Sequence, residues 1–519
     1  MNIVPKPYES ELREGRFVFT EDTAISSPLP AVVRLLDAFG NGGRPAFERN
    51  RIEFSLTQVP YDYVLEVAEN KITVVAPREE GLYHGAVTLK QLLSAPSDGE
   101  VGIGACVVRD KPRFAYRGML VDVCRHFFGV DTIKKIIDAI SLFKFNYLHL
   151  HLSDDQGFRL QTDSLPELYL KGSVRAETCG DGKPHGGYYT KKQVQELVAY
   201  ARERFVEIVP EIDLPGHTRA IIAAYPELSC TGESTTVGTD FGIHAKMLCA
   251  GSEKVYDAVE KLLTEVAEMF PCGYFHLGGD EVPKLVWENC PKCNEKMRKE
   301  GLRTFEELQG YFTNRAIAVL KKLGKTPILW NESLYSDMLD SCAAVQYWEA
   351  KKNAGDRVKR AVAEEGRRII VSRCSPYYFD YPCAFWPLKS VYNFEPCTPE
   401  LGGKDGSCVL GVECPIWTEH VSTEEKLFFR VFPRAAAVAE SGWSTPEKDY
   451  KDFVRRLDKV LGVLCEAGVN FEPVKKCNPD PISRMFTCAA FGINAAKRAN
   501  PESARNYASI SSRKELSDK

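Results

Sequence analysis

The sequence predicts an α/β protein: a closed (β/α)8 TIM barrel over residues 111–470 that follows a small α+β domain at residues 1–110. From residue 115 onward, short apolar runs alternate with longer amphipathic stretches, and there are eight such runs. Alternating β and α elements favour parallel strands joined by right-handed crossovers, and eight such units close into a barrel. No G-x-G-x-x-G motif follows the first run, which disfavours the alternative, a doubly wound open sheet.

The first domain contains three short β-branched runs and one amphipathic helix. Strands are predicted at residues 51–56, 62–67 and 71–76, each bounded by polar residues. A helix is predicted at residues 79–93, because its leucines recur near one face. The stretch 111–113, with its proline and two basic residues, marks the boundary with the barrel.

The barrel strands are predicted where the apolar runs occur. They span residues 116–123, 147–152, 206–213, 273–281, 326–332, 343–348, 367–373 and 409–417. Three of the intervening helices begin with residues at the spacing of a capping box, namely Thr190 with Gln193, Thr304 with Glu307 and Ser422 with Glu425. A last helix is predicted at 446–467, and the polar extension at 471–519 is expected to end in a mobile segment.

The composition excludes several classes of protein. Lys and Arg total 67 and Asp and Glu total 71, so the net charge of 67 − 71 = −4 argues against a nucleic-acid partner held by a basic surface. No apolar run approaches the ~20 residues of a membrane span, and the first residues lack the apolar core of a secretory signal. The 17 cysteines are odd in number and scattered, so most are expected to be buried thiols. We expect a cytoplasmic protein; a secreted protein whose signal has been removed stays an alternative, and a homodimer stays open.

Polar residues gather at the ends of seven of the eight predicted barrel strands, where the catalytic groups of a TIM barrel lie. They are Asp122 and Arg125; Ser153–Gln156; Glu211, Asp213 and His217; Asp280 and Glu281; Trp330–Glu332; Trp348 and Glu349; and Trp417–Glu419. Any single acidic residue could instead cap a helix, as expected for Asp131. Carboxylates that converge on one face repel one another and raise each other's pKa. A purely structural protein would gain nothing from such a cluster. The pattern therefore favours an enzyme.

The adjacent pair Asp280 and Glu281 carries the most information. The glycines at 278 and 279 can bend the backbone at the end of the strand and direct both carboxylates toward one pocket. One carboxylate can then stay ionised while the other, in a drier position, stays protonated, as general acid catalysis requires. An Asp-Glu pair is more often part of a solvated loop, but this one follows the apolar run YFHLGG.

Three of the six tryptophans fall at predicted strand ends, Trp330, Trp348 and Trp417. A tryptophan in the core is the usual alternative. Mixed with Asp and Glu at equivalent positions of the ring, however, these side chains favour a polar ligand that has apolar faces. A sugar ring has both features, so the sequence predicts a carbohydrate site.

Competing chemistries have weaker support. His149 and His151 have the His-x-His spacing of a metal hydrolase, but both lie inside an apolar run, where a core histidine is expected. Cys290 and Cys293 form only half of a zinc site, because no second C-x2-C or H-x3-H motif lies at the usual spacing. Phosphate-binding G-x-x-x-x-G-K-[ST] and nucleophilic G-x-S-x-G motifs are both missing from the sequence. We therefore expect no metal and no cofactor.

Five motifs in order resemble glycoside hydrolase family 20, the β-N-acetylhexosaminidases. They are RGMLVDVCRHF (117–127), YLHLHLSDDQGFR (147–159), PEIDLPGH (210–217), HLGGDEV (276–282) and PIWTEH (415–420). The resemblance covers about residues 112–445, and residues 1–110 resemble the family's accessory α+β domain, which is zincin-like in topology without a metal. It implies hydrolysis of terminal β-linked GlcNAc or GalNAc from a glycan or chitooligosaccharide, with retention of configuration. The substrate's own 2-acetamido oxygen is the nucleophile, and an oxazolinium-type intermediate forms.

The resemblance also implies a role for individual residues. Glu281 would be the acid and then the base, and Asp280 would orient the acetamide and balance its developing charge. The residues expected to bind the sugar are Arg117, Trp330, Trp348, Tyr378, Asp380, Trp417 and Glu419. Asp154 and His217 would tune Glu281, with Asp155 as a substitute for Asp154. The alternatives are a catalytically silent sugar-binding barrel, a disaccharide-releasing member of the family, and a metal-dependent amidohydrolase.

Overall fold

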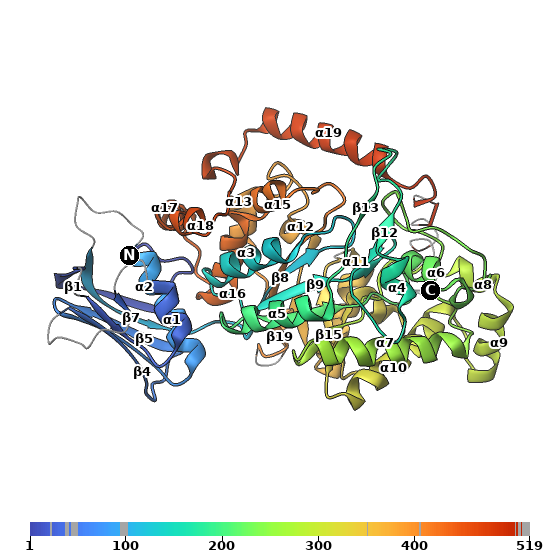
Figure 1. Ribbon diagram of the computed structural model, residues 1–519, viewed down its shortest axis with the longest axis horizontal. Coiled ribbons are helices and arrows are strands. Elements are labelled where there is room, and N and C mark those ends of the chain that lie inside the picture. The colour runs from blue at the N-terminus through green and yellow to red at the C-terminus, as the bar shows by residue number, and fades with distance from the viewer. Residues whose placement is uncertain are drawn as a thin grey trace.

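The N-terminal 110 residues of the computed structural model form a seven-stranded mixed sheet in the order β1-β7-β5-β6-β4-β2-β3 (Figure 1). The strands are β1 (Glu9–Val18), β2 (Ala24–Ser26), β3 (Asn41–Gly42), β4 (Arg51–Leu56), β5 (Tyr63–Ala68), β6 (Lys71–Ala76) and β7 (Gly102–Asp110). The helices are α1 (Pro30–Leu36) and α2 (Glu79–Leu93). The structure describes residues 1–20, 23–36, 41–42, 50–93, 102–349, 351–403, 406–503, 505–506 and 510.

The predicted strands and helix of this domain are confirmed at β4, β5, β6 and α2, with β5 displaced by one residue. Helix α2 is buried almost all round, because it lies between the sheet and the barrel. The Gln91 amide, for example, donates to the Leu142 carbonyl oxygen of the barrel at 2.7 Å. Strand β1 was not predicted, because most of its side chains are exposed and its sequence shows little hydrophobic alternation.

Eight parallel strands close into a barrel in the order β14-β15-β16-β17-β18-β19-β8-β9. They are β8 (Tyr116–Asp122), β9 (Tyr147–His151), β14 (Glu207–Glu211), β15 (Tyr274–His276), β16 (Thr326–Trp330), β17 (Ala344–Tyr347), β18 (Ile369–Val371) and β19 (Val409–Ile416). The predicted TIM barrel and all eight of its strands are confirmed. The predicted strand at 273–281 is shorter in the structure, because the backbone turns at Gly278.

Helices of ten residues or more connect most of these strands or follow the last of them. They are α3 (Val130–Ser141), α5 (Lys191–Arg202), α7 (Glu253–Met269), α9 (Pro291–Glu300), α10 (Phe305–Lys322), α11 (Lys352–Glu365), α16 (Arg434–Trp443) and α17 (Tyr450–Val460). The shorter helices are α4 (Glu167–Leu170), α6 (Arg219–Ala224), α8 (Leu285–Glu288), α12 (Cys374–Tyr377), α13 (Leu388–Asn393), α14 (Pro399–Gly402), α15 (Glu424–Val431) and α18 (Gly462–Glu466). Two short hairpins, β10 (Ser153–Asp154) with β11 (Gly157–Phe158) and β12 (Val174–Arg175) with β13 (His185–Gly186), lie in the loop after β9.

The helix starts follow the predicted caps in two cases of three. Thr190 forms a complete capping box with Gln193, and the Thr304 side chain accepts from the backbone N–H of residue 307. The third cap is one residue later than predicted, because Thr423 rather than Ser422 accepts the backbone N–H bond. Asp131 is not a cap: α3 already begins at Val130, so the carboxylate lies in the first turn.

The C-terminal extension differs from the predicted polar tail. The predicted helix at 446–467 is present as α17 and α18, but a further helix, α19 (Pro481–Arg498), crosses the barrel surface (Figure 1). Asp480 caps it by accepting the backbone N–H groups of residues 482 and 483. The ring of Phe491 packs at 5.5 Å from Tyr381 and 5.1 Å from His420, near the barrel mouth. The segment 511–519, expected to be mobile, lies outside the described residues.

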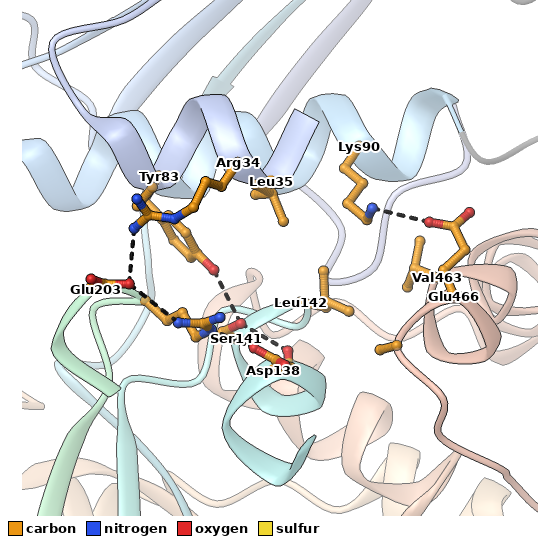
Figure 2. Close-up of a pocket in the computed structure, with 13 residues that line it drawn as sticks. Arg34, Leu35, Tyr83, Lys90, Asp138, Ser141, Leu142, Glu203, Val463 and Glu466 are labelled. Carbon is orange, nitrogen blue, oxygen red and sulfur yellow. Dashed lines mark hydrogen bonds and ion pairs between the residues drawn. The ribbon is translucent and has the colours of Figure 1, made fainter. Parts of the chain in front are cut away.

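The two domains contact each other around a pocket that is lined by polar and apolar side chains from both (Figure 2). Arg34 of α1 pairs with Glu203 of the barrel at 2.9 Å, and both side chains are 54% exposed. The Tyr83 hydroxyl of α2 lies 3.2 Å from the Ser141 hydroxyl at the end of α3. No helix in the described ranges has the length and apolarity needed to cross a membrane.

A second, fully buried set of contacts joins the domains at the end of β7. The Lys144 ammonium donates to Asp110 at 2.9 Å, and neither side chain is exposed to solvent. The Tyr63 hydroxyl and the Trp443 indole N–H also donate to this carboxylate, at 2.7 and 2.9 Å. Asp110 therefore links its own sheet to the barrel.

Candidate active site

A pocket opens at the carboxyl end of the barrel strands, and most of the predicted site residues line it. These residues are His217, Asp280, Glu281, Trp348, Tyr378, Asp380, Trp417 and Glu419. They follow β14, β15, β17, β18 and β19. Segments as far apart as residues 217 and 419 meet because the parallel strands all end on the same face. Asp154 and Trp330 lie beneath this layer, and Arg117 lies elsewhere.

The loop after β15 presents Asp280 and Glu281 through an unusual backbone path. Gly278, Gly279 and Glu281 all have positive φ, at 65°, 97° and 48°. A Cβ atom on Gly278 would lie 1.8 Å from the Asp213 carboxylate, so only glycine fits there. The Gly279 N–H donates to that carboxylate at 3.0 Å, and the Glu281 N–H donates to Glu332. These bonds hold both carboxyl groups at the pocket.

His217 lies between the pair Asp280 and Glu281 and two buried acids. Its Nε2 lies 3.5 Å from a Glu281 oxygen and 4.0 Å from an Asp280 oxygen, and its Nδ1 lies 3.3 Å from Asp155 and 3.6 Å from Asp154. Burial disfavours a charged ring, but these carboxylates outweigh it and raise the pKa of His217 well above its usual range. The imidazole is therefore a cation in contact with Glu281.

Burial raises the pKa values of the acids that line the pocket. The pKa of Asp280 is well above its usual range because of burial and the nearby Asp213, although His217 opposes the shift. The pKa of Asp380 is also well above its usual range, because of burial and Glu419. Burial raises the pKa of Asp213 to about 7 in spite of His217. A ligand that donates hydrogen bonds or carries positive charge would stabilise the ionised form of each of these carboxyl groups.

The aromatic residues form one wall of the pocket and part of its floor. Trp348 is stacked on Tyr378 with ring centroids 6.1 Å apart, and Trp417 lies 6.1 Å from the same tyrosine. Trp330 lies deeper, is 1% exposed, and donates its indole N–H to Glu211 at 3.0 Å. It packs 6.0 Å from Trp417 and therefore supports the wall from below.

Arg117 does not lie at the pocket, which corrects the prediction made for it. It is the second residue of β8, at the end of the barrel away from the pocket, and is 2% exposed. Its guanidinium donates to the carbonyl oxygens of Phe114 and Lys144, each at 2.8 Å. The motif that contains Arg117 therefore has a structural arginine at its start.

Arg125 occupies the position at the pocket that was predicted for Arg117. It pairs with Asp154 at 2.8 Å, and its guanidinium lies 5.2 Å from the Trp417 ring centroid. Burial opposes its charge, but Asp154 and Glu419 raise its pKa further above the usual range. It lies three residues beyond the end of β8, among the polar residues that the sequence places at the strand ends, although the sugar-binding role was assigned to Arg117.

Several buried polar atoms of the pocket have no hydrogen-bond partner in the described part of the chain. Among them are Oδ1 of Asp280, Oδ1 of Asp380 and Nε1 of Trp348. Buried polar atoms are nearly always paired in folded proteins, so unpaired ones mark places where a ligand donates or accepts. The acceptors and the indole donor lie beside flat aromatic faces, which suits a ring that carries hydroxyl and amide groups.

His149 and His151 lie in the interior of the barrel beneath the pocket, as expected for core histidines. His149 Nδ1 is 3.0 Å from Glu413, and His151 lies 2.5 Å from Glu211 through Nδ1 and 2.8 Å from Asp154 through Nε2. Their ring nitrogens are thus engaged by carboxylates. This buried layer positions Asp154 and Trp330, which in turn support Arg125 and Trp417.

Comparison with protein families agrees with this geometry. The profile described as "Glycosyl hydrolase family 20, catalytic domain" matches residues 114–446, and "Glycosyl hydrolase family 20, domain 2" matches residues 1–111. The chain belongs to glycosyl hydrolase family 20. Its barrel is thus the family's catalytic domain, and the sheet that precedes it is the family's second domain.

Two named β-hexosaminidases are similar along most of the chain. The β-hexosaminidase of Porphyromonas gingivalis is 38% identical over 429 residues, which are 79% of this chain and 54% of that protein. The β-N-acetylhexosaminidase of Cellulomonas fimi is 32% identical over 485 residues, 88% of this chain and 92% of that protein. The chain therefore spans about half the length of the first relative and nearly all of the second.

Solved structures of the family have the same fold. The exo-β-N-acetylglucosaminidase of Vibrio harveyi in complex with N-acetylglucosamine gives a TM-score of 0.81 at 27% identity, covering 91% of this chain and 78% of that one. A mutant β-hexosaminidase of Streptomyces plicatus in complex with the product GlcNAc gives 0.79 at 31% identity, covering 91% and 96%.

Proposed function

We propose that this family 20 chain is an exo-acting β-N-acetylhexosaminidase that removes terminal β-linked GlcNAc or GalNAc with retention of configuration. The observation that carries the proposal is the adjacent pair of carboxylates at one pocket, of which one contacts a charged histidine and the other has an unpaired oxygen. Two neighbouring residues on one loop cannot reach opposite faces of a sugar ring, as an enzymic nucleophile and an acid must. The N-acyl group of the substrate supplies the nucleophile instead.

Glu281 acts first as acid and then as base. Its side chain is 24% exposed at the pocket, so it can reach the oxygen that links the terminal sugar to the next residue. It protonates that oxygen as the bond to the anomeric carbon breaks, and the acetamide oxygen attacks the same carbon. Glu281, now ionised, then removes a proton from the water that opens the oxazolinium intermediate.

Asp280 stabilises the charge that forms on the acetamide nitrogen. Burial and the nearby Asp213 disfavour a carboxylate at this position, as the raised pKa of Asp280 shows. A positive charge that develops beside Oδ1 relieves this penalty, so the interaction is stronger in the transition state than in the substrate complex. The acetamide N–H is the donor that this oxygen lacks.

The rest of the pocket binds the ring. Asp380 and Glu419 accept hydrogen bonds from the sugar hydroxyls. Arg125, which pairs with Asp154, donates hydrogen bonds to the sugar from the side of the pocket. Trp348, Tyr378 and Trp417 cover the apolar face of the ring and the acetamide methyl group. Exclusion of water by these rings strengthens each polar contact.

A panel of glycosides that differ at C2 tests the proposal. The chain is expected to hydrolyse aryl β-N-acetylglucosaminides and N-acetylgalactosaminides, and to leave the matching 2-hydroxy and 2-deoxy glycosides intact. A thiazoline mimic of the bicyclic intermediate is expected to inhibit tightly. Equal rates on the 2-hydroxy compounds would refute substrate assistance, and release of disaccharides from natural glycans would refute an exo cut at one residue.

Substitution Glu281→Gln tests the role of the acid. Glutamine keeps the shape of the side chain but cannot give up a proton, so kcat on an unactivated chitooligosaccharide should fall by at least ~10²-fold. Glu268→Gln, on the exposed side of α7, is the matched control and should leave kcat unchanged. Turnover near the wild-type value in Glu281→Gln would remove this residue from the mechanism.

A further inference from the structure

Four cysteines that belong to no part of the sugar pocket converge at one point of the barrel rim. Cys249, Cys290 and Cys293 are buried, and Cys230 is half-buried. The Sγ atom of Cys249 lies 3.8 Å from that of Cys290 and 3.7 Å from that of Cys293, and Cys230 lies 3.9 Å from Cys293. All four sulfur atoms lie within 4.8 Å of one another.

These distances fit a tetrahedron around one ion. Zinc binds thiolate sulfur at about 2.3 Å, which places the corners of an ideal tetrahedron about 3.8 Å apart. A disulfide requires two sulfurs at about 2.05 Å, so the observed separations are too long for covalent pairing. Sets of four thiolates are typical of structural zinc sites.

The backbone allows the two segments that carry the four thiols to approach each other closely. Cys290 precedes the first turn of α9 and Cys293 lies within that turn, the C-x2-C half of a zinc motif. The other half comes from two single cysteines on facing segments, where Ser229 and Leu248 form an antiparallel bridge. A Cβ atom on Gly251 would lie 2.4 Å from the backbone nitrogen of Cys293, so only glycine allows the two halves to meet.

We propose that Cys230, Cys249, Cys290 and Cys293 bind one structural Zn²⁺ ion. This departs from the expectation of no metal, because C-x2-C alone gave only two ligands and the other two are single residues at 230 and 249. The site requires reduced thiols, which the cytoplasmic location expected from the sequence would supply. The inference does not rest on the proposed function.

The ion would join the two loops that carry the catalytic residues. The Leu248 N–H donates to the Pro215 carbonyl oxygen at 3.3 Å, two residues before His217. The Trp287 indole N–H donates to the Leu248 carbonyl oxygen at 2.9 Å, in the segment that runs from Glu281 to Cys290. Closing these two loops on one ion fixes the position of His217 relative to Glu281, and the role is that of a positioning element.

Metal analysis of the full-length chain, purified under reducing conditions without chelator, tests the site. We expect elemental mass spectrometry to find about one zinc ion per chain. After exchange for Co²⁺, we expect the thiolate-to-cobalt charge-transfer and d–d absorption bands of a tetrahedral sulfur site. Neither readout depends on activity, so the zinc proposal and the proposed function can fail separately.

Paired variants separate loss of a ligand from loss of the fold. Cys230→Ala removes the half-buried ligand and is expected to abolish stoichiometric zinc and the cobalt bands, whereas Cys230→His replaces one ligand by another and should keep both. Cys106→Ala, a buried thiol of the first domain, is the control and should bind zinc like the wild type.

Four outcomes would overturn the proposal. They are zinc well below one per chain in folded wild-type protein, iron in place of zinc, intact-mass evidence for two disulfides among the four residues, and undiminished zinc in Cys230→Ala.

Discussion

Adjacent carboxylates at the end of β15 differ because their surroundings differ. Asp280 lies near Asp213 and has an unpaired oxygen, whereas Glu281 is more exposed and contacts the charged His217. The same side-chain chemistry can thus supply an acid at one position and a charge-balancing group at the next.

Asp280→Asn should reduce kcat more than it raises KM. Asparagine keeps an oxygen that accepts from the acetamide N–H, so binding of the substrate is largely retained, but the charge that balances the oxazolinium is lost. We expect kcat to fall by about 10²-fold or more, measured on an aryl N-acetylglucosaminide. A change confined to KM would show that the residue only binds substrate.

His217→Asn should move the acid limb of the pH profile of kcat/KM to higher pH. Burial and Asp213 raise the pKa of Asp280, and the His217 cation opposes them, so loss of that cation raises the pKa of Asp280 further. Because Asp280 must be ionised to act, activity is then lost at a higher pH as the solution is acidified. His217 has a raised pKa and stays charged throughout this limb.

The control for this experiment is His420→Asn. Burial lowers the pKa of His420 to about 4, so the ring is neutral over the same range and its replacement removes no charge. The acid limb of this variant should coincide with that of the wild type. An unmoved limb in His217→Asn would exclude the electrostatic link to Asp280.

At the scale of single residues, sequence patterns identified the acids and aromatics but misplaced one arginine. Asp280 and Glu281 stand out because two glycines and an apolar run precede them. Arg117 and Arg125 belong to the same motif and lie at opposite ends of β8; the sequence placed Arg125 at the strand end, but the role at the sugar was assigned to Arg117. Asp213 and Glu332 accept backbone N–H bonds from the loop after β15, and that proximity is set by the closed barrel rather than by local sequence.

At the scale of elements, the loop after β15 depends on glycine at 278. Gly278→Ala is expected to destabilise the protein by about 2 kcal/mol or more, because the new methyl group would overlap Asp213 at a backbone angle that L-residues rarely adopt. Chemical denaturation measures the free energy of unfolding, and enzymatic activity should fall together with it.

Gly273→Ala is the matched substitution at the other end of the same strand. It precedes β15, its φ is not positive, and a Cβ atom there would meet no described atom within 4 Å. Stability close to that of the wild type is expected. Equal stability of the two variants would show that close packing at Gly278 does not determine the shape of the loop after β15.

The strands of the barrel could be predicted because they are buried apolar runs, whereas elements at the surface could not. All eight barrel strands follow from short runs of Val, Ile and Leu between amphipathic stretches. Helix α19 was missed because it has no buried stripe: Ile482, Met485, Phe486 and Ile493 are all exposed on it. Its position depends on contacts with loops far away in the sequence, such as that of Phe491 with His420.

At the scale of the whole molecule, a buried ion pair couples the two domains. Asp110→Asn is expected to lower the free energy of unfolding by about 3–5 kcal/mol, because it leaves the buried Lys144 without its counter-ion. Burial already lowers the pKa of Lys144, and Asp110 is the main group that opposes this. Thermal or chemical unfolding of the full chain measures the loss.

The exposed ion pair at the same interface provides the comparison. Glu203→Gln breaks the contact with Arg34 at the edge of the interdomain pocket, where both side chains are largely in water (Figure 2). Its cost should be at most about 1 kcal/mol. Similar losses in the two variants would mean that burial does not decide the strength of the link between the domains.

The floor of the pocket limits how a long substrate can be processed. Beneath Trp417 the barrel is filled by the buried side chains of Trp330, His276 and Glu211, so the cavity is a dead end. A polymer cannot thread through it, and a freed monosaccharide has to leave by the opening through which it came. Hydrolysis of a long glycan should therefore be distributive, with one monosaccharide removed in each binding event. Accumulated monosaccharide should compete with the next chain end for the same opening.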